Sequence, residues 1–77
     1  MRGDAGFAKR CGSLLRQLRK SKGMTQQELA LAVGMSRQGI TQMEIGRRSP
    51  CLLSLVKLFR ALGASLAALD SLLQDTH

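Results

Sequence analysis

The spacing of apolar residues predicts helices along most of the chain. In the first, over residues 8–21, an apolar stripe is formed by Phe7, Cys11, Leu14, Leu15 and Leu18. Intervals of three and four positions place these residues on one face of a helix with 3.6 residues per turn. Gly23 follows, and a residue able to adopt positive φ just past a helix favours its end there.

The second predicted helix, over residues 25–33, has recognisable signals at both ends. Thr25 is an N-cap, and Glu28 three residues later completes a capping box, in which each side chain accepts the other residue's backbone N–H. Gly34 breaks the helix as a left-handed turn residue. A third helix is predicted over residues 36–45.

The third helix starts at the N-cap Ser36, and its apolar Ile40 and Met43 point inward at i, i+3 spacing. The polar residues between them are left facing outward. Gly39 lies in the first turns, where glycine costs on the order of 1 kcal/mol relative to alanine. Glycine at this position therefore needs an explanation, and close approach to a binding partner is one.

The last third of the chain is rich in leucine. Ser49 and Pro50 predict the start of a fourth helix, with an N-cap followed by proline at the first helical position, and Gly63 ends it. A fifth helix is predicted over residues 66–74. The inward stripe of the fourth helix is expected to consist of Leu52, Leu55, Leu58 and Leu62. Since no segment alternates like a strand, the fold class is all-α, a compact bundle of five helices.

Length and charge narrow the class of protein. The 77 residues form one domain, 1–77, with a thin core. Twelve basic against five acidic residues give a net charge of +7, which points to nucleic acid as a partner. The positive charge is concentrated in the first two thirds, and the leucine-rich last third is neutral. The alternative is that the basic residues only keep a small protein in solution.

Several other classes are disfavoured by the sequence. No apolar run reaches the roughly 18–20 residues of a membrane span, and the N-terminus lacks an apolar signal core. Cys11 and Cys51 form no CxxC pair and have no neighbouring histidine, so we expect no metal site, no disulfide and a reducing cytoplasm. No nucleophile–base pair or phosphate loop is recognisable, so we expect no enzyme, catalytic residue, cofactor or small-molecule ligand.

The two short helices meet the demands of a helix-turn-helix unit over residues 25–45. Such a unit needs a small residue where the helices cross, a glycine in the turn and apolar residues on the inner face of the second helix. These are Ala30, Gly34, Ile40 and Met43. The polar face of the third helix is then free to enter a major groove about 12 Å wide.

At these positions the sequence resembles the Cro/cI-type helix-turn-helix family, which includes the lambdoid phage repressors. The resemblance covers roughly residues 8–70 and is carried by Leu18, Arg19, Gly23, Met24, Thr25, Gln26, Gln27, Glu28, Leu29, Ala30, Gly34, Met35, Ser36, Ile40, Glu44, Gly46 and Pro50. It implies a lambda-repressor-like bundle of about five helices that binds operator DNA as a two-fold dimer.

The resemblance also implies residue roles. The resemblance assigns contacts to DNA bases to Ser36, Arg37, Gln38, Thr41 and Gln42. It assigns contacts to DNA phosphates to Gln26, Arg47 and Arg48. The residue types suit these roles, because Arg can bridge guanine O6 and N7 and Gln can bridge adenine N6 and N7. Arg19 and Glu44 match a partly buried ion pair between the first and third helices, and for them we prefer this structural role to DNA contact.

The excess of leucine in the last third of the chain predicts a second interaction surface. Not all apolar residues of the last two helices, over about residues 50–74, fit into so small a core, and an exposed apolar patch marks an interface. We expect a homodimer or partner surface that includes Leu53, Val56, Leu69 and Leu73. The function expected is that of a sequence-specific double-stranded DNA-binding transcriptional regulator. It would be a repressor, since no activation or ligand domain is recognisable, and would bind a palindromic operator as a homodimer.

An antitoxin is the alternative. The segments Arg47-Arg48-Ser49-Pro50 and Leu62-Gly63-Ala64-Ser65-Leu66 are similar to antitoxins of the Hip toxin-kinase type. Such a protein represses its own operon and also binds a toxin, and the end of its chain forms an intersubunit strand instead of a helix. A purely structural or RNA-binding role also stays open at this point.

Overall fold

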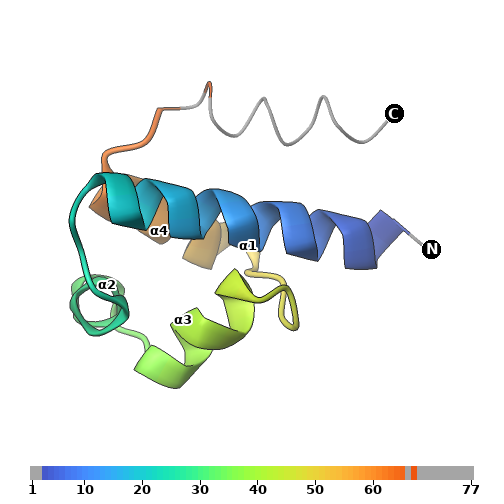
Figure 1. The fold of residues 1–77 in the computed structure, drawn as a ribbon, viewed down its shortest axis with the longest axis horizontal. Coiled ribbons are helices and arrows are strands. Elements are labelled where there is room, and N and C mark those ends of the chain that lie inside the picture. Colours follow the sequence, from blue (N-terminus) through green and yellow to red (C-terminus); the bar gives the residue numbers. More distant parts are fainter. Residues whose placement is uncertain (1–2, 66, 68–77) are drawn as a thin grey trace.

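Four helices form the part of the chain that the computed structural model describes, residues 3–65 and 67. They are α1 (Gly3–Ser21), α2 (Gln26–Val33), α3 (Arg37–Glu44) and α4 (Leu52–Leu62), and these residues include no strand. Figure 1 shows α1 along the length of the molecule, α4 behind it, and α2 and α3 along one side. The all-α class is therefore confirmed. The predicted fifth helix, over 66–74, lies outside the described residues apart from residue 67.

The ends of α2 form as the sequence predicts. The Thr25 hydroxyl accepts the backbone N–H of Glu28 at 3.0 Å, and the Glu28 carboxylate accepts that of Thr25 at 2.8 Å. Gly34 ends the helix in the left-handed region, with φ of 73° and its N–H bonded to the carbonyl oxygen of Ala30. Because L side chains rarely adopt that conformation, glycine makes this abrupt turn into α3 possible.

Two helices begin elsewhere than predicted. Helix α1 begins at Gly3, ahead of residue 8, because the apolar stripe starts only at Phe7 and periodicity cannot mark a turn that precedes it. The predicted start of α4 at Ser49 and Pro50 is wrong. The backbone is still extended at Cys51, with φ of −74° and ψ of 169°, and the helix begins at Leu52. A Ser-Pro pair permits a helix start, but here the loop from α3 continues through Cys51.

The core lies where the four helices meet. Its buried residues are Cys11, Leu15, Leu29, Ala30, Val33, Ile40, Met43, Leu55, Leu58, Phe59 and Leu62. The predicted inward positions of Ile40 and Met43 are confirmed, each being 1% exposed. The inward position predicted for Leu52 is wrong, since this side chain is 74% exposed. Leu52 lies in the first turn of α4, and the buried stripe starts one turn later at Leu55.

Helix α1 approaches the end of α3 with no side chain between their backbones. Gly12 is buried on α1, and a Cβ atom built there would overlap the carbonyl oxygen of Met43 and lie 2.8 Å from that of Glu44. The periodicity of apolar residues does not single out Gly12. Its signal was a glycine in the interior of an amphipathic helix, where glycine is unfavourable unless packing requires it. This contact fixes α3 against α1.

Candidate nucleic-acid interface

The polar face of α3 lies at an edge of the molecule, away from the core. Figure 1 shows α3 below α1, with its lower side uncovered by the other labelled helices. Arg37 and Gln38 are exposed and Gln42 is half-buried. The other two predicted base readers are engaged within the protein. Ser36 accepts the N–H of Gly39 through its hydroxyl at 3.0 Å, and the Thr41 hydroxyl lies 3.0 Å from the side-chain oxygen of Gln26.

Gly39 fits against residues of its own chain. A Cβ atom there would lie 3.2 Å from Ser36 Oγ, 3.6 Å from Met35 Cε and 3.9 Å from Arg48 Nη1. Gly39 is thus close to the N-cap, the turn and the loop after α3, and the partner contact stays a prediction. The same distances place the Arg48 guanidinium beside the first turn of α3, close to the predicted base readers.

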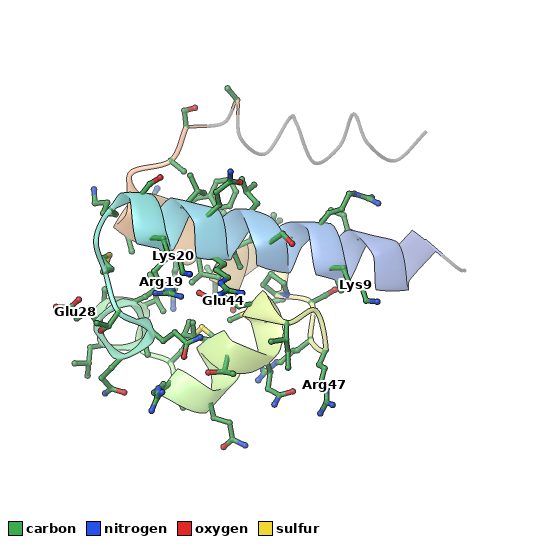
Figure 2. The ribbon with its side chains drawn as sticks, viewed as in Figure 1. Lys9, Arg19, Lys20, Glu28, Glu44 and Arg47 are labelled. Atoms are coloured by element: carbon green, nitrogen blue, oxygen red, sulfur yellow. The ribbon has the colours of Figure 1, made fainter. Side chains whose placement is uncertain are left out.

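The loop after α3 brings together basic side chains from distant parts of the sequence. Arg47 and Arg48 are exposed, and Figure 2 shows Arg47 pointing away from the body of the molecule. Lys9 of α1 is also exposed, and its stem packs against Gly46, where an added Cβ atom would lie 2.7 Å from Lys9 Cγ. Lys9 therefore extends this basic edge. Nothing in its sequence surroundings signals this, because only the fold places Lys9 beside the loop.

Arg19 and Glu44 are joined inside the protein and connect to Gln26. Arg19 Nε donates to Glu44 Oε2 at 2.6 Å and Nη2 donates to Oε1 at 3.0 Å, while Nη1 donates to the carbonyl oxygen of Met24 at 2.8 Å. The amide Nε2 of Gln26 donates to Glu44 Oε1 at 3.1 Å. Figure 2 shows the Arg19 and Glu44 side chains meeting between α1 and α3. The ion pair thus holds together α1, the start of α2 and the end of α3.

This arrangement keeps Glu44 ionised. Burial acts to raise the pKa of Glu44, but the hydrogen bonds from Arg19 and Gln26 and the positive charges of Arg19 and Arg16 outweigh it. The pKa therefore lies below that of an ordinary glutamate. The same hydrogen bond favours the charged form of Arg19. It raises the pKa of Arg19, against the opposing effect of burial.

Stability is expected to fall in acid because of Glu44. Since the pKa of Glu44 is lower in the folded chain than in the unfolded one, its contribution is present above the unfolded value, about 4.3 for glutamate. It is lost as the pH falls through the folded value. Urea unfolding at a series of pH values from 7 to 3 measures this loss. The Glu44→Gln variant should be less stable at neutral pH and lose less on acidification, and equal losses in both proteins would contradict the assignment.

Gln26 lies at the start of α2, beside a shallow depression. The depression is lined by Arg19, Met24, Thr25, Gln26, Gln27 and Arg37. Backbone N–H groups in the first turn of a helix lack intrahelical acceptors and favour an anion. The predicted phosphate-binding residue Gln26 and the predicted reader Arg37 therefore border one electropositive hollow.

The outer face of α4 is apolar. Leu52, Leu53 and Val56 are 74%, 64% and 42% exposed. Leu52 and Val56 border a hollow of about 230 Å³ between α4 and the segment that follows it. The structure thus leaves Leu53 and Val56 of the predicted interface uncovered by described residues. Leu69 and Leu73, the other two residues of that prediction, lie outside the described residues.

The cysteines are free thiols in different surroundings. Cys11 is buried, which raises the pKa of its thiol, and Cys51 is exposed. The pKa of Cys51 is lowered by a hydrogen bond with the Ser54 hydroxyl, whose oxygen lies 3.4 Å from the sulfur.

Over the described ranges there is no cluster of three or more metal-ligating side chains. None of the helices described combines the length and apolar character needed to cross a membrane.

Comparison with known proteins finds helix-turn-helix proteins among sequences and among solved structures. A helix-turn-helix family model, HTH_3, matches residues 15–69. An SPbeta prophage-derived uncharacterized HTH-type transcriptional regulator of Bacillus subtilis, YonR, is 44% identical over 66 residues, which cover 86% of this chain and 58% of the relative. The chain thus spans little more than half the length of that relative.

Solved structures share the fold. The clp gene regulator ClgR from Corynebacterium glutamicum is 32% identical, with a TM-score of 0.81 over 92% of each chain. The restriction-modification controller protein C.AhdI from Aeromonas hydrophila is 34% identical, with a TM-score of 0.75 over 80% of this chain and 94% of that one. These relatives do not support a toxin partner.

Proposed function

Because this chain belongs to the helix-turn-helix family HTH_3, we propose that it is a sequence-specific transcription regulator that binds double-stranded DNA with α3 in the major groove. The observation that carries the proposal is the polar edge of α3. Arg37 and Gln38 are exposed there, while Ile40 and Met43 on the opposite side of the helix are buried in the core. A helix held in this way can enter a groove about 12 Å wide without disturbing the fold.

The charged groups around α3 provide positioning. Arg47 and Arg48 follow α3, and Gln26 lies at the N-terminus of α2, which favours phosphate. Contacts to phosphate fix the register of a protein on the duplex, whereas contacts to base edges select the sequence. We therefore assign sequence selection to Arg37, Gln38 and Gln42, and positioning to the residues that flank them.

We further propose that the protein acts as a homodimer on a palindromic operator and as a repressor. The exposed apolar side chains on α4, Leu52, Leu53 and Val56, support an interface between copies. Two-fold symmetry would place the two α3 helices about 34 Å apart, on successive major grooves of one DNA face. Repression is the most direct effect of such binding, because an occupied operator excludes other proteins.

Selection from random duplexes tests the proposal. The protein should enrich a sequence with two inverted half-sites, and duplex RNA should compete poorly for it. Sedimentation should show a dimer of the free protein and two copies per operator in the complex. Enrichment of no sequence, or equal competition by RNA, would overturn sequence-specific DNA binding. A single copy bound to a single half-site, with a monomer in free solution, would overturn the dimer alone.

The division between selecting and positioning residues makes a separate prediction. Gln38→Ala and Gln42→Ala should lose about 1–3 kcal/mol of discrimination per lost base contact, and only at particular base pairs. Arg48→Ala should weaken binding to all duplexes about equally and reduce the salt slope by about one charge. Titrations of each variant against single-base operator variants at several salt concentrations measure both effects. Equal weakening of every duplex by both classes of variant would contradict the division.

A further inference from the structure

The hydroxyl of Thr41 is directed toward the protein instead of being free for DNA. Thr41 is half-buried in the second turn of α3, with Oγ1 3.0 Å from Gln26 Oε1 and 3.1 Å from the carbonyl oxygen of Arg37. Both neighbours are acceptors, and a hydroxyl has one proton to donate. The donor capacity of Thr41 is therefore used inside the protein.

The amide of Gln26 has one orientation that satisfies its neighbours. Glu44 is ionised and can only accept, so the nitrogen of the Gln26 amide must face it, as the 3.1 Å contact has it. The amide oxygen then faces Thr41, whose hydroxyl donates to it at 3.0 Å. The opposite orientation would place two acceptors against each other at Glu44.

This orientation leaves one N–H of Gln26 for an acceptor outside the protein. The amide nitrogen carries two hydrogens, and Glu44 accepts one of them. Gln26 borders the hollow at the start of α2, where the N-terminal end of the helix and Arg37 also favour an anion. A DNA phosphate in that hollow would accept the second N–H.

We propose that Thr41 is a positioning residue and not a base-reading residue. Its hydroxyl holds the Gln26 amide in the orientation that binds phosphate, and so links the docking of α2 on the DNA backbone to the placement of α3. The proposal rests on the proposed function, since it assumes that DNA phosphate binds at Gln26. Thr41 acts through Gln26, so its effect on affinity is the same for every base sequence.

Variants of Thr41 and Gln26 test this in DNA binding. Thr41→Val removes the hydroxyl while keeping the shape of the side chain, and Thr41→Ser keeps the hydroxyl. Thr41→Val should weaken binding to all duplexes by about two- to tenfold, with base preferences unchanged, and Thr41→Ser should bind nearly as well as the unaltered protein. On a Gln26→Ala background, Thr41→Val should cause no further loss. Thermal unfolding of each variant separates the change in affinity from any change in stability.

Two results would overturn this proposal while leaving the proposed function in place. A loss of preference at one or two base pairs in Thr41→Val would make Thr41 a reader. An undiminished loss on the Gln26→Ala background would show that Thr41 acts independently of Gln26. A protein that enriches no duplex would overturn the proposed function, and with it the role of Thr41 on DNA.

The hydrogen-bond network can be examined without DNA. The side-chain amide resonances of Gln26 in NMR spectra of the free protein should shift in Thr41→Val and stay close to their original positions in Thr41→Ser. Unchanged resonances in Thr41→Val would overturn the proposal whether or not the protein binds DNA.

Discussion

Replacement of Glu44 by alanine is expected to destabilise the fold by about 3–5 kcal/mol, because it leaves the buried guanidinium of Arg19 without its charged partner. The carbonyl oxygen of Met24 would still accept one of its hydrogens, but Nε and Nη2 would lose their acceptors. Since small domains have only about 5–15 kcal/mol of stability, this loss would unfold a substantial part of the population on mild heating. Urea unfolding followed by circular dichroism measures it.

Glu28→Ala provides the matched control. Glu28 is also a helix residue with a hydrogen-bonded carboxylate, but it is exposed and its hydrogen bond lies within the cap of α2, so its loss should cost about 1 kcal/mol. A cost for Glu44→Ala no greater than that for Glu28→Ala would contradict the importance of the buried pair.

Removal of both charges extends the experiment. The Arg19→Met, Glu44→Leu double variant should be more stable than either single variant, because a buried pair often contributes little over apolar residues of similar volume. The double variant should nevertheless bind DNA more weakly, since Gln26 loses the acceptor that orients its amide.

Gly12→Ala should also destabilise the protein, by about 1–3 kcal/mol, despite the higher helix propensity of alanine. The added methyl group would overlap the carbonyl oxygen of Met43 and press on that of Glu44. Both are backbone atoms, which cannot rotate aside, so α1 and α3 must separate. The separation would also strain the ion pair between those helices.

Gly6→Ala offers the comparison within the same helix. A Cβ atom at Gly6 would meet only the end of the Arg10 side chain, at 3.3 Å, and that group can move. The substitution should therefore be neutral or stabilise α1 by up to about 1 kcal/mol. Unfolding curves of both variants give the comparison, and equal effects of the two substitutions would show that the contact at Gly12 is not restrictive.

Much of the fold follows from local signals in the sequence. The capping box at Thr25 and Glu28 satisfies backbone groups within a single turn, and Gly34 sets the turn through its own backbone. The burial of Ile40 and Met43 follows from helix periodicity alone. None of these features needs knowledge of what packs against the helix.

The features that the sequence did not reveal depend on contacts between distant segments. Leu52 fits the apolar period of α4, but no described helix covers its turn, so it is exposed. Lys9 joins the basic edge only because α1 packs on Gly46. Thr41 has the residue type and position of a reader, and its bond to Gln26 depends on the angle between α2 and α3. The periodicity of apolar residues and the capping residues carry no information on contacts between distant segments.

The exposed side chains of α3 have a consequence for the divergence of related genes. Arg37 and Gln38 contribute to the edge of the molecule and not to its core, and substitutions at such surface positions usually change stability by no more than about 0.5 kcal/mol. If these side chains select the target sequence, as proposed, a duplicated gene can acquire a new target site through a few substitutions without an unstable evolutionary intermediate. The same property makes these positions suitable for engineering regulators that do not cross-react within one cell.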